Sequence, residues 1–434
     1  MTNKKVLVIT YYWPPSGGSG VQRWLKFVKY LTRKGWEPMV FTPENPSFTI
    51  KDESLNKDIP ATVEVIRFPI WEPYHIFFGL QRLFGKKNIS QSDLITTGKK
   101  SFFQKVSSWV RGNFFIPDAR VFWVKPSVKI IGDLITSNQI TKIITTGPPH
   151  SIHLIGLRLK KKYPDLKWIA DFRDPWSEWD LLDTLSLTSI AKARHSQLEN
   201  QVLTTADRVI TIAPYHVDRL KALSSRDVDL ITNGFDVEDF TSIERIPNQR
   251  FMIRHIGIVD ELRDPKPVME VIKKICKEHP DTASQIRVEF IGHVNSNFQD
   301  YINSDTVLSN VVSFRKHVPH NELLKIYGQT ELQLLVLAHT AIAPGNLPGK
   351  LFEYLASGNQ ILAIGPIEGD AAQVIRKTNA GVIHERGDVE GIRESILHFY
   401  QAWRDNKNVP GRDVTDYTRD KLTDQLITIL ESLD

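Results

Sequence analysis

Short apolar segments alternate with amphipathic segments along almost the whole chain, and this alternation restricts the fold more than any other feature. The first pair is an apolar run at 6–10 followed by 21–34, where Val21, Trp24 and Val28 fall on one face of a helix. Apolar strands that are each followed by a helix predict a parallel sheet covered by helices on both faces. In this half of the chain we expect strands at 6–10, 37–42, 142–146, 168–172, 208–213 and 229–232.

The alternation stops once and then starts again. Residues 241–250 are polar and contain Pro247, which is typical of a linker, and a second series of strands and helices runs from 252 to 403. A final amphipathic segment at 415–433 has no strand after it, so we expect it to pack back onto an earlier part of the chain. The 434 residues also exceed the usual size of one domain.

The fold class that we expect is therefore α/β, with two Rossmann-like, doubly wound domains and a returning C-terminal helix. The domains span 1–240 and 250–405, and the helix at 412–434 packs on the first domain. Open parallel sheets bind ligands outside the carboxyl ends of their strands. Two such sheets facing each other predict one ligand site in a cleft between the domains.

Composition excludes several classes of protein. The chain has one cysteine, Cys276, which excludes a disulfide framework and a cysteine-based metal site and fits a reducing compartment. We see no secretory signal before the first strand and no apolar run of about 18 residues, so we expect a cytoplasmic protein. The net charge of +5 attracts anions of many kinds and by itself decides little.

An insertion at about 74–130 is rich in basic and aromatic residues. Between Lys86 and Lys129 only Asp93 and Asp118 are acidic, and phenylalanines and tryptophans lie between the basic residues. Basic and aromatic surfaces suit anionic membranes, which suggests peripheral binding at the inner face of the cytoplasmic membrane. The alternative is a helical insertion that covers the first sheet. The basic residues of this stretch are Lys86, Lys87, Lys99, Lys100, Lys105, Arg111, Arg120, Lys125 and Lys129.

A glycine-rich turn follows the first strand. Gly17, Gly18 and Gly20 precede a helix, and backbone N–H groups at such a turn can bind an anion together with the helix dipole. The spacing is neither G-x-G-x-x-G nor a P-loop. A flexible turn without a ligand is the competing interpretation.

Two further polar clusters follow strands of the first domain. His150 and His153 are three positions apart and share a helix face, which suits hydrogen bonding to a sugar hydroxyl or a phosphate. Asp171 and Asp174 stand in "DFRDPWSEW", where carboxylates and tryptophans resemble a carbohydrate site. The alternatives are a turn capped by His150, and an Asp–Arg ion pair with packed tryptophans.

The stretch "NLPGKLFEYLASG", residues 346–358, carries the strongest signal. Pro348 and Gly349 begin a helix, Lys350 lies in its first turn and Glu353 lies one turn later. A helix N-terminus beside an ammonium group favours a pyrophosphate, and a glutamate one turn on can accept hydrogen bonds from a ribose. A surface ion pair is the alternative.

Taken together and in order, these motifs resemble those of bacterial retaining glycosyltransferases of family GT4, which have the GT-B fold. The resemblance implies that Glu353 binds the ribose of a nucleotide diphosphate sugar, and that Arg263 and Lys350 bind its diphosphate together with the amides of Gly17, Gly18 and Gly20. In many members of the family the lysine instead follows the first strand of the second domain, which would be near Lys266. The loop of Lys316, His317 and Val318 corresponds to the place that holds the base.

Many members of that family have a second glutamate eight positions before the first, where this chain has Gly345. We therefore expect the donor sugar to contact Gly345, Asn346 and Leu347, with backbone N–H groups of 343–346 substituting for the missing carboxylate. His150 or His153 would hold the donor sugar, and Asp171 or Asp174 would orient the acceptor.

The expected reaction moves a hexose-type sugar to an acceptor hydroxyl with retention of configuration. We expect no cofactor, no metal requirement and no nucleic-acid partner. The expected partners are a nucleotide sugar and a saccharide or lipid-linked acceptor, as in cell-surface polysaccharide or glycolipid synthesis. Two alternatives stay open: a nucleotide-sugar epimerase or hydrolase of the same fold, and a non-catalytic protein that binds membrane surfaces.

Overall fold

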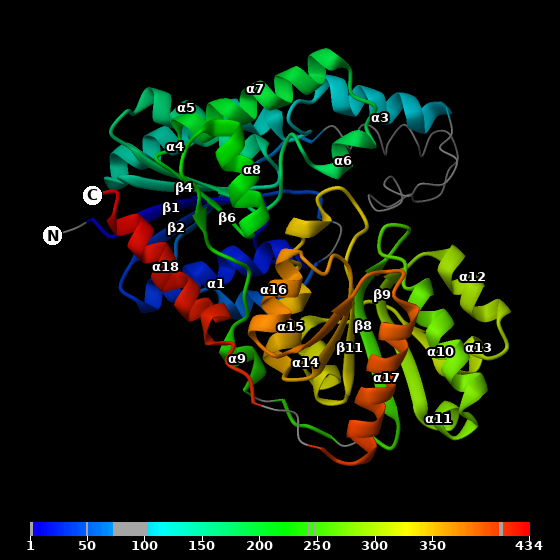
Figure 1. The fold of residues 1–434 in the computed structure, drawn as a ribbon. Helices are drawn as coiled ribbons and strands as arrows, with labels where there is room; N and C mark the ends of the chain where they lie inside the picture. The colour runs from blue at the N-terminus through cyan, green and yellow to red at the C-terminus, as the bar shows by residue number, and fades with distance from the viewer. Residues whose placement is uncertain (1–2, 49–50, 73–101, 242, 247, 408–410) are drawn as a thin grey trace. The chain divides into compact units, whose positions relative to one another are not determined.

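The computed structural model describes residues 3–48, 51–72, 102–241, 243–246, 248–407 and 411–434 (Figure 1). The chain forms two compact units. The first comprises 1–232 together with 422–434, and the second comprises 233–421. The part of the basic and aromatic insertion from 74 to 101 lies outside the described residues.

The sheet of the first unit is entirely parallel, with strand order β3-β2-β1-β4-β5-β6-β7. The order reverses between β1 and β4, which is the point where open sheets of this type bind ligands. Its strands are β1 (Lys5–Ile9), β2 (Glu37–Pro43), β3 (Val65–Phe68), β4 (Lys142–Gly147), β5 (Lys167–Phe172), β6 (Arg208–Thr211) and β7 (Asp229–Leu230).

Helices cover both faces of this sheet. One apolar cluster joins Leu7 and Ile143 of the strands to the helices α4, α5 and α7. The other joins Val8 to Trp24 of α1 and to Leu426 of α18, so the end of the C-terminal helix belongs to the core of the first unit. The helices are α1 (Ser19–Arg33), η1 (Glu53–Asp58), α3 (Phe102–Phe114), α4 (Val121–Asn138), α5 (Ser151–Lys162), α6 (Asp180–Asp183), α7 (Ser189–Thr205), α8 (Pro214–Ser224) and α18 (Arg419–Glu431).

The second unit repeats this plan with a parallel sheet in the order β10-β9-β8-β11-β12-β13. Its strands are β8 (Phe251–Val259), β9 (Ile286–Val294), β10 (Val312–Arg315), β11 (Leu332–Val336), β12 (Gln360–Ile364) and β13 (Gly381–His384). Its helices are α9 (Val237–Phe240), α10 (Lys266–Glu278), α11 (Pro280–Gln285), α12 (Ser296–Ser304), α13 (Leu308–Val311), α14 (His320–Gly328), η2 (Ala343–Gly345), α15 (Gly349–Ser357), α16 (Asp370–Lys377), α17 (Val389–Arg404) and η3 (Thr415–Tyr417).

The predicted strands are all present, and β3 was not predicted. Its four residues run parallel to β2 and are mostly half-buried, so they lack the continuous apolar run of the central strands. The insertion contains α3 and most of α4, and Trp123 of α4 stacks on Phe41 in the core with its ring 1% exposed. Part of the aromatic content of the insertion therefore belongs to the interior. Among the described residues, no helix is long and apolar enough to cross a bilayer.

Candidate functional site

Arg173 connects three loops at the carboxyl ends of strands in the first unit. It follows β5, and its Nη2 donates to the carbonyl oxygen of Pro148 after β4 at 2.7 Å. A Cβ atom on Gly20 would lie 2.8 Å from its Nη1, so the guanidinium lies against the turn and would have to shift if this residue had a side chain. The guanidinium also lies 5.9 Å from the ring centre of Tyr12.

The glycine-rich turn thus brings a cation to the beginning of α1. Gly18 is the N-cap residue of this helix, has φ of +93° and is exposed. Gly17 and Gly20 are half-buried beside it. A helix N-terminus and a guanidinium both favour an anion, so the geometry suits the predicted diphosphate contact.

His150 and His153 lie below the surface, 4% and 0% exposed, beside Gly147. The ring of His150 stacks on Trp176 at 5.1 Å, and that of His153 stacks on Phe172 at 4.4 Å. His150 is the N-cap residue of α5 but makes no side-chain capping bond. Both side chains therefore pack in an aromatic layer under the loops.

Each imidazole has one ring nitrogen without a hydrogen-bond partner among the described residues. Nε2 of His150 donates to the carbonyl oxygen of Pro175 at 3.2 Å, which leaves Nδ1 as an acceptor. Nδ1 of His153 lies 2.9 Å from the Thr145 hydroxyl, which already accepts from an indole, so we assign the ring proton of His153 to Nε2. One acceptor and one donor then point to the same place, which is the pattern that a single hydroxyl group satisfies.

The environment of these histidines keeps them neutral. Burial, followed by the charge of His153, lowers the pKa of His150 well below its ordinary value. Burial and the charge of Arg173 lower the pKa of His153 to about 3. Neutral imidazoles can orient a hydroxyl, but they add no positive charge at pH 7.

Asp171 has a structural position. Its carboxylate is 0% exposed and accepts from Arg23 Nη2 at 3.0 Å, from Trp24 Nε1 at 2.6 Å and from the Thr146 hydroxyl at 2.9 Å. It therefore holds α1 on the carboxyl end of the sheet and has no surface to offer an acceptor. The Asp–Arg pair that the sequence suggested does exist, but the arginine is Arg23.

Asp174 has the opposite environment. It is partly exposed, and its carboxylate accepts no hydrogen bond from the described residues. Withdrawal from water raises its pKa, and Arg173 opposes this effect. Of the two predicted carboxylates, Asp174 is the one available to a ligand.

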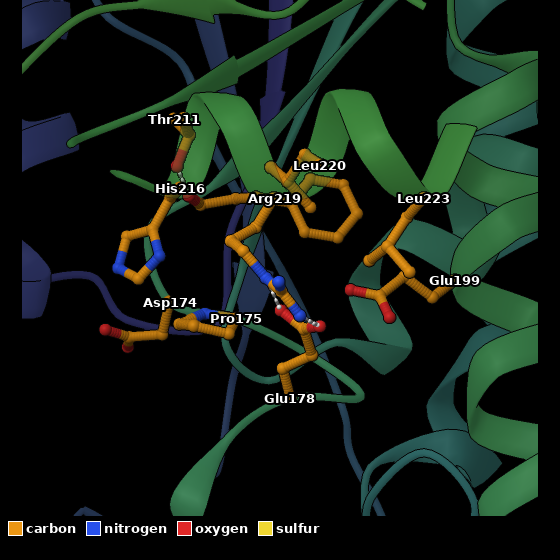
Figure 2. Close-up of a pocket in the computed structure, with 10 residues that line it drawn as sticks. Asp174, Pro175, Glu178, Glu199, Thr211, His216, Arg219, Leu220 and Leu223 are labelled. Atoms are coloured by element: carbon orange, nitrogen blue, oxygen red, sulfur yellow. Dashed lines mark hydrogen bonds and ion pairs between the residues drawn. The ribbon is translucent and has the colours of Figure 1, made fainter. Parts of the chain in front are cut away.

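A small cavity lies beside Asp174 at the carboxyl ends of β5 and β6 (Figure 2). Its volume is about 10 Å³, which holds one water and no sugar. The Glu178–Arg219 ion pair lines it, and Asp174 points away from that pair. His216 also lines it, and burial lowers the pKa of His216 to about 4.

In the second unit, Lys350 and Glu353 form one connected group at the beginning of α15. Lys350 Nζ lies 2.8 Å from Glu353 Oε2, and the Tyr327 hydroxyl donates to the same oxygen at 2.6 Å. Glu353 is 6% exposed, whereas Lys350 is half-buried. Tyr327 on α14 was not predicted, because only the tertiary fold brings it to α15.

Arg263 follows β8 and is held by Asp260, with Nη1 2.7 Å from Oδ2. His255 lies below it, 4% exposed, with Nδ1 donating to the carbonyl oxygen of Leu334 at 3.0 Å. Burial lowers the pKa of His255 to about 4, and the charges of Arg263 and Lys350 contribute. Sequence reasoning did not single out this buried imidazole.

The backbone N–H groups of the predicted donor-sugar segment already have hydrogen-bond partners. The amides of Ala343, Gly345 and Asn346 already donate to carbonyl oxygens within the turn, at 3.0–3.1 Å, and Pro344 has no N–H. These amides are used by the turn, and their contact with the donor sugar stays a prediction. Leu347 is buried, whereas the half-buried side-chain amide of Asn346 has no hydrogen bond to the described residues.

The predicted base-binding loop lies directly after β10. Lys316 and His317 are exposed and Val318 is half-buried. The described part of the chain contains no group of three or more histidine, cysteine, aspartate or glutamate residues that could hold a metal ion.

Several solved structures have the same fold as this chain. Sucrose-phosphate synthase from Thermosynechococcus elongatus has a TM-score of 0.63 at 12% identity, over 99% of this chain and 98% of that one. The fold is GT-B. WaaG, a glycosyltransferase involved in lipopolysaccharide biosynthesis, has a TM-score of 0.56 at 13% identity, over 97% and 99% of the two chains.

A third structure extends the range of activities found on this fold. A protein described as a UDP-N-acetylglucosamine 2-epimerase from Listeria monocytogenes has a TM-score of 0.55 at 10% identity, over 99% and 96% of the chains. No protein-family model matches the sequence, and no curated protein matches it either. The predicted fold class is therefore confirmed, and the activity has to be argued from the site.

Proposed function

We propose that this protein is a retaining glycosyltransferase that takes its sugar from a nucleotide diphosphate sugar. The observation that carries the proposal is the group of Lys350, Glu353 and Tyr327 at the beginning of α15, on a fold shared with glycosyltransferases. The helix N-terminus and Lys350 supply positive charge for a diphosphate. The Glu353 carboxylate is fixed from two sides and suits a ribose.

In the proposed reaction, the bond between the anomeric carbon and the diphosphate oxygen breaks as the acceptor oxygen bonds to the same face of that carbon. The acceptor proton passes to the leaving phosphate oxygen. Lys350 and Arg263 stabilise the growing negative charge, which is the main electrostatic contribution. His150 and His153 orient a hydroxyl of the donor sugar, and Asp174 orients the acceptor.

The direct test is an assay of purified protein with a panel of nucleotide sugars and candidate saccharide and lipid-linked acceptors. Transfer with release of the nucleoside diphosphate, and with the anomeric configuration retained by NMR, is the expected result. Inversion of configuration would contradict the front-face reaction. Lys350→Met is expected to reduce turnover on the order of a hundredfold, as removal of one transition-state charge does in other enzymes.

An epimerase activity is the second candidate, because an epimerase description is attached to one structure with this fold. It differs from transfer in needing no acceptor. Incubation with the donor alone separates the two: an epimerised or hydrolysed sugar formed at the same rate without an acceptor would replace the transferase proposal.

We also propose that α3 and the beginning of α4 bind an anionic membrane, which would suit a lipid-linked acceptor. Four large aromatic side chains are exposed here: Trp71 53%, Trp109 41%, Phe114 68% and Phe122 46%. They contact one another in pairs, with Trp71 on Phe122 at 5.0 Å and Trp109 on Phe114 at 5.7 Å. Amphipathic aromatic rings near basic residues are typical of interfacial binding.

Flotation with vesicles tests the proposed membrane binding. Trp109→Ser and Phe114→Ser together are expected to abolish flotation on vesicles that contain phosphatidylglycerol. Ile190→Ser, which removes an even more exposed apolar side chain from α7, serves as the control. Flotation that ignores both salt and lipid charge would contradict the electrostatic part of the proposal.

A further inference from the structure

The second unit has another charged cavity, away from the group at α15. Its volume is about 490 Å³, which is within the range of small-molecule sites. The first half of β8, the first half of β9, the edge strand β10 and the end of α13 line it. Four arginines contribute to its wall, Arg250, Arg254, Arg287 and Arg315, and Glu289 is the one carboxylate among the described lining residues.

Strand register places these side chains on one face of the sheet. Arg254 pairs with Glu289, and Glu289 pairs with Ser313 of β10. Two positions earlier, Met252 pairs with Arg287. Because side chains two apart on a strand share a face, Arg254, Arg287 and Glu289 line the cavity from one face of the sheet.

Glu289 compensates only part of the positive charge. Its Oε2 accepts from Arg254 Nε at 2.7 Å, and its Oε1 lies 2.9 Å from Arg315 Nη2. A further carboxylate, Glu331, accepts from the amide of Met252 at 2.9 Å and from the side chain of Asn248.

Arg250 and Arg287 carry the excess charge. Neither has an ion pair with the described residues, and Arg287 Nη1 donates only to carbonyl oxygens, with that of Ala283 at 3.2 Å. Withdrawal from water and then the charge of Arg250 lower the pKa of Arg287. Both guanidinium groups line the cavity, so an anion bound there would compensate charge that the described carboxylates leave unpaired.

We propose that this cavity is a second site, which binds a phosphate group carried by a small phosphomonoester or by a lipid headgroup. Guanidinium groups bind phosphate oxygens through paired hydrogen bonds, and the hydroxyls of Ser309 and Ser313 line the same space. The volume leaves room for the organic part of the ligand.

The site is separate from the proposed donor site, and the inference does not rest on the proposed activity. Arg254 lies five residues before Val259, the last residue of β8, which is about 16 Å along the strand. Arg315, however, directly precedes Lys316 of the predicted base-binding loop. A phosphate bound to Arg315 would therefore act next to the donor site without occupying it.

The test is calorimetric titration of the full chain with inorganic phosphate and with glycerol 3-phosphate. It uses a Lys350→Met, Glu353→Gln background, so that phosphate does not bind at α15. Adding Arg250→Ser, an exposed position that folding does not need, is expected to weaken binding about tenfold or more. Arg287→Gln is expected to have the same effect, and Arg404→Ser, an exposed arginine of α17, is expected to have none.

Vesicles of phosphatidylcholine with and without phosphatidic acid identify the source of the phosphate. Binding of glycerol 3-phosphate without vesicle binding supports a soluble ligand, and vesicle binding that Arg250→Ser removes supports a headgroup. Phosphate binding that is unchanged in the Arg250→Ser and Arg287→Gln proteins would overturn the proposal, as would no binding in the background protein. Neither result would affect the donor-site assignment, which is read from nucleotide binding by the wild-type protein.

Discussion

Two aspartates three positions apart differ because of what surrounds them, and this difference can be measured. Asp171 compensates the buried Arg23, whose side chain is also 0% exposed. Asp171→Asn leaves that charge without its partner and is expected to lower the free energy of unfolding by about 3–5 kcal/mol. Urea unfolding monitored by circular dichroism measures this.

Asp174→Asn is the matched comparison. Its carboxylate has no hydrogen bond to lose among the described residues and is already disfavoured as a charge, so stability should change by less than about 1 kcal/mol while transfer falls. If Asp171→Asn were as stable as the wild type, Asp171 would not have the structural role described above.

The buried histidines predict a pH dependence of stability. Below about pH 6.5 the unfolded chain binds protons at histidine that the folded chain does not, because folding lowers the pKa of His153 to about 3 and of His255 to about 4. The contribution of these neutral histidines to the free energy of unfolding is therefore fully present above pH 6.5 and is lost as the pH falls. Below pH 6.5, each of the two histidines lowers the free energy of unfolding by about 1.4 kcal/mol per pH unit.

Unfolding free energies measured between about pH 7.5 and about pH 5 check this expectation, because this interval contains the ordinary pKa of histidine, about 6.5. His153→Gln should remove one histidine's share of the slope, whereas His398→Gln, at an exposed position on α17, should not. An equal slope in the wild-type and His153→Gln proteins would contradict the neutral state of this imidazole.

At the scale of elements, a comparison of two glycines distinguishes the effect of backbone strain from the effect of a lost ligand contact. Gly18 and Gly35 both have positive φ, +93° and +77°, and a Cβ atom on either would meet nothing within 4 Å. Leucine at either position therefore introduces similar strain. Only Gly18 lies at the beginning of α1, where it is the N-cap residue.

We expect Gly18→Leu to reduce turnover more than nucleotide affinity, and Gly35→Leu to change neither beyond its effect on stability. Steady-state kinetics and nucleotide titrations of both variants measure this. Loss of nucleotide binding alone in Gly18→Leu would mean that the turn, and not α15, is the primary nucleotide site.

The elements also show where sequence reasoning works. The central strands and the helices α1, α15 and α17 are predictable because their apolar residues follow a period or a continuous run. The strand β3 and the interior position of Trp123 are not, because only packing distinguishes a half-buried strand or a core indole from a surface one. The partners of Asp171 and Glu353 could not be predicted either, since Arg23 is 148 residues from Asp171 and Tyr327 belongs to another helix, α14.

For the whole molecule, the GT-B fold is shared by transferases and by a protein described as an epimerase, so the fold alone does not name the reaction. The proposed use of a nucleotide sugar rests on the residues at α15 of this chain. They are also the part of the molecule where a small change should have the largest effect on ligand binding.

The most direct measurement is calorimetric titration of UDP, GDP, dTDP and ADP into the wild-type, Glu353→Gln, Lys350→Met and Lys325→Met proteins. One nucleoside diphosphate should bind the wild type, and either change at α15 should weaken it about tenfold or more, since each removes a charged hydrogen bond. Lys325→Met, at an exposed position of α14, should bind like the wild type. Equal nucleotide affinity in all four proteins would contradict the assignment of Lys350 and Glu353 as the donor site.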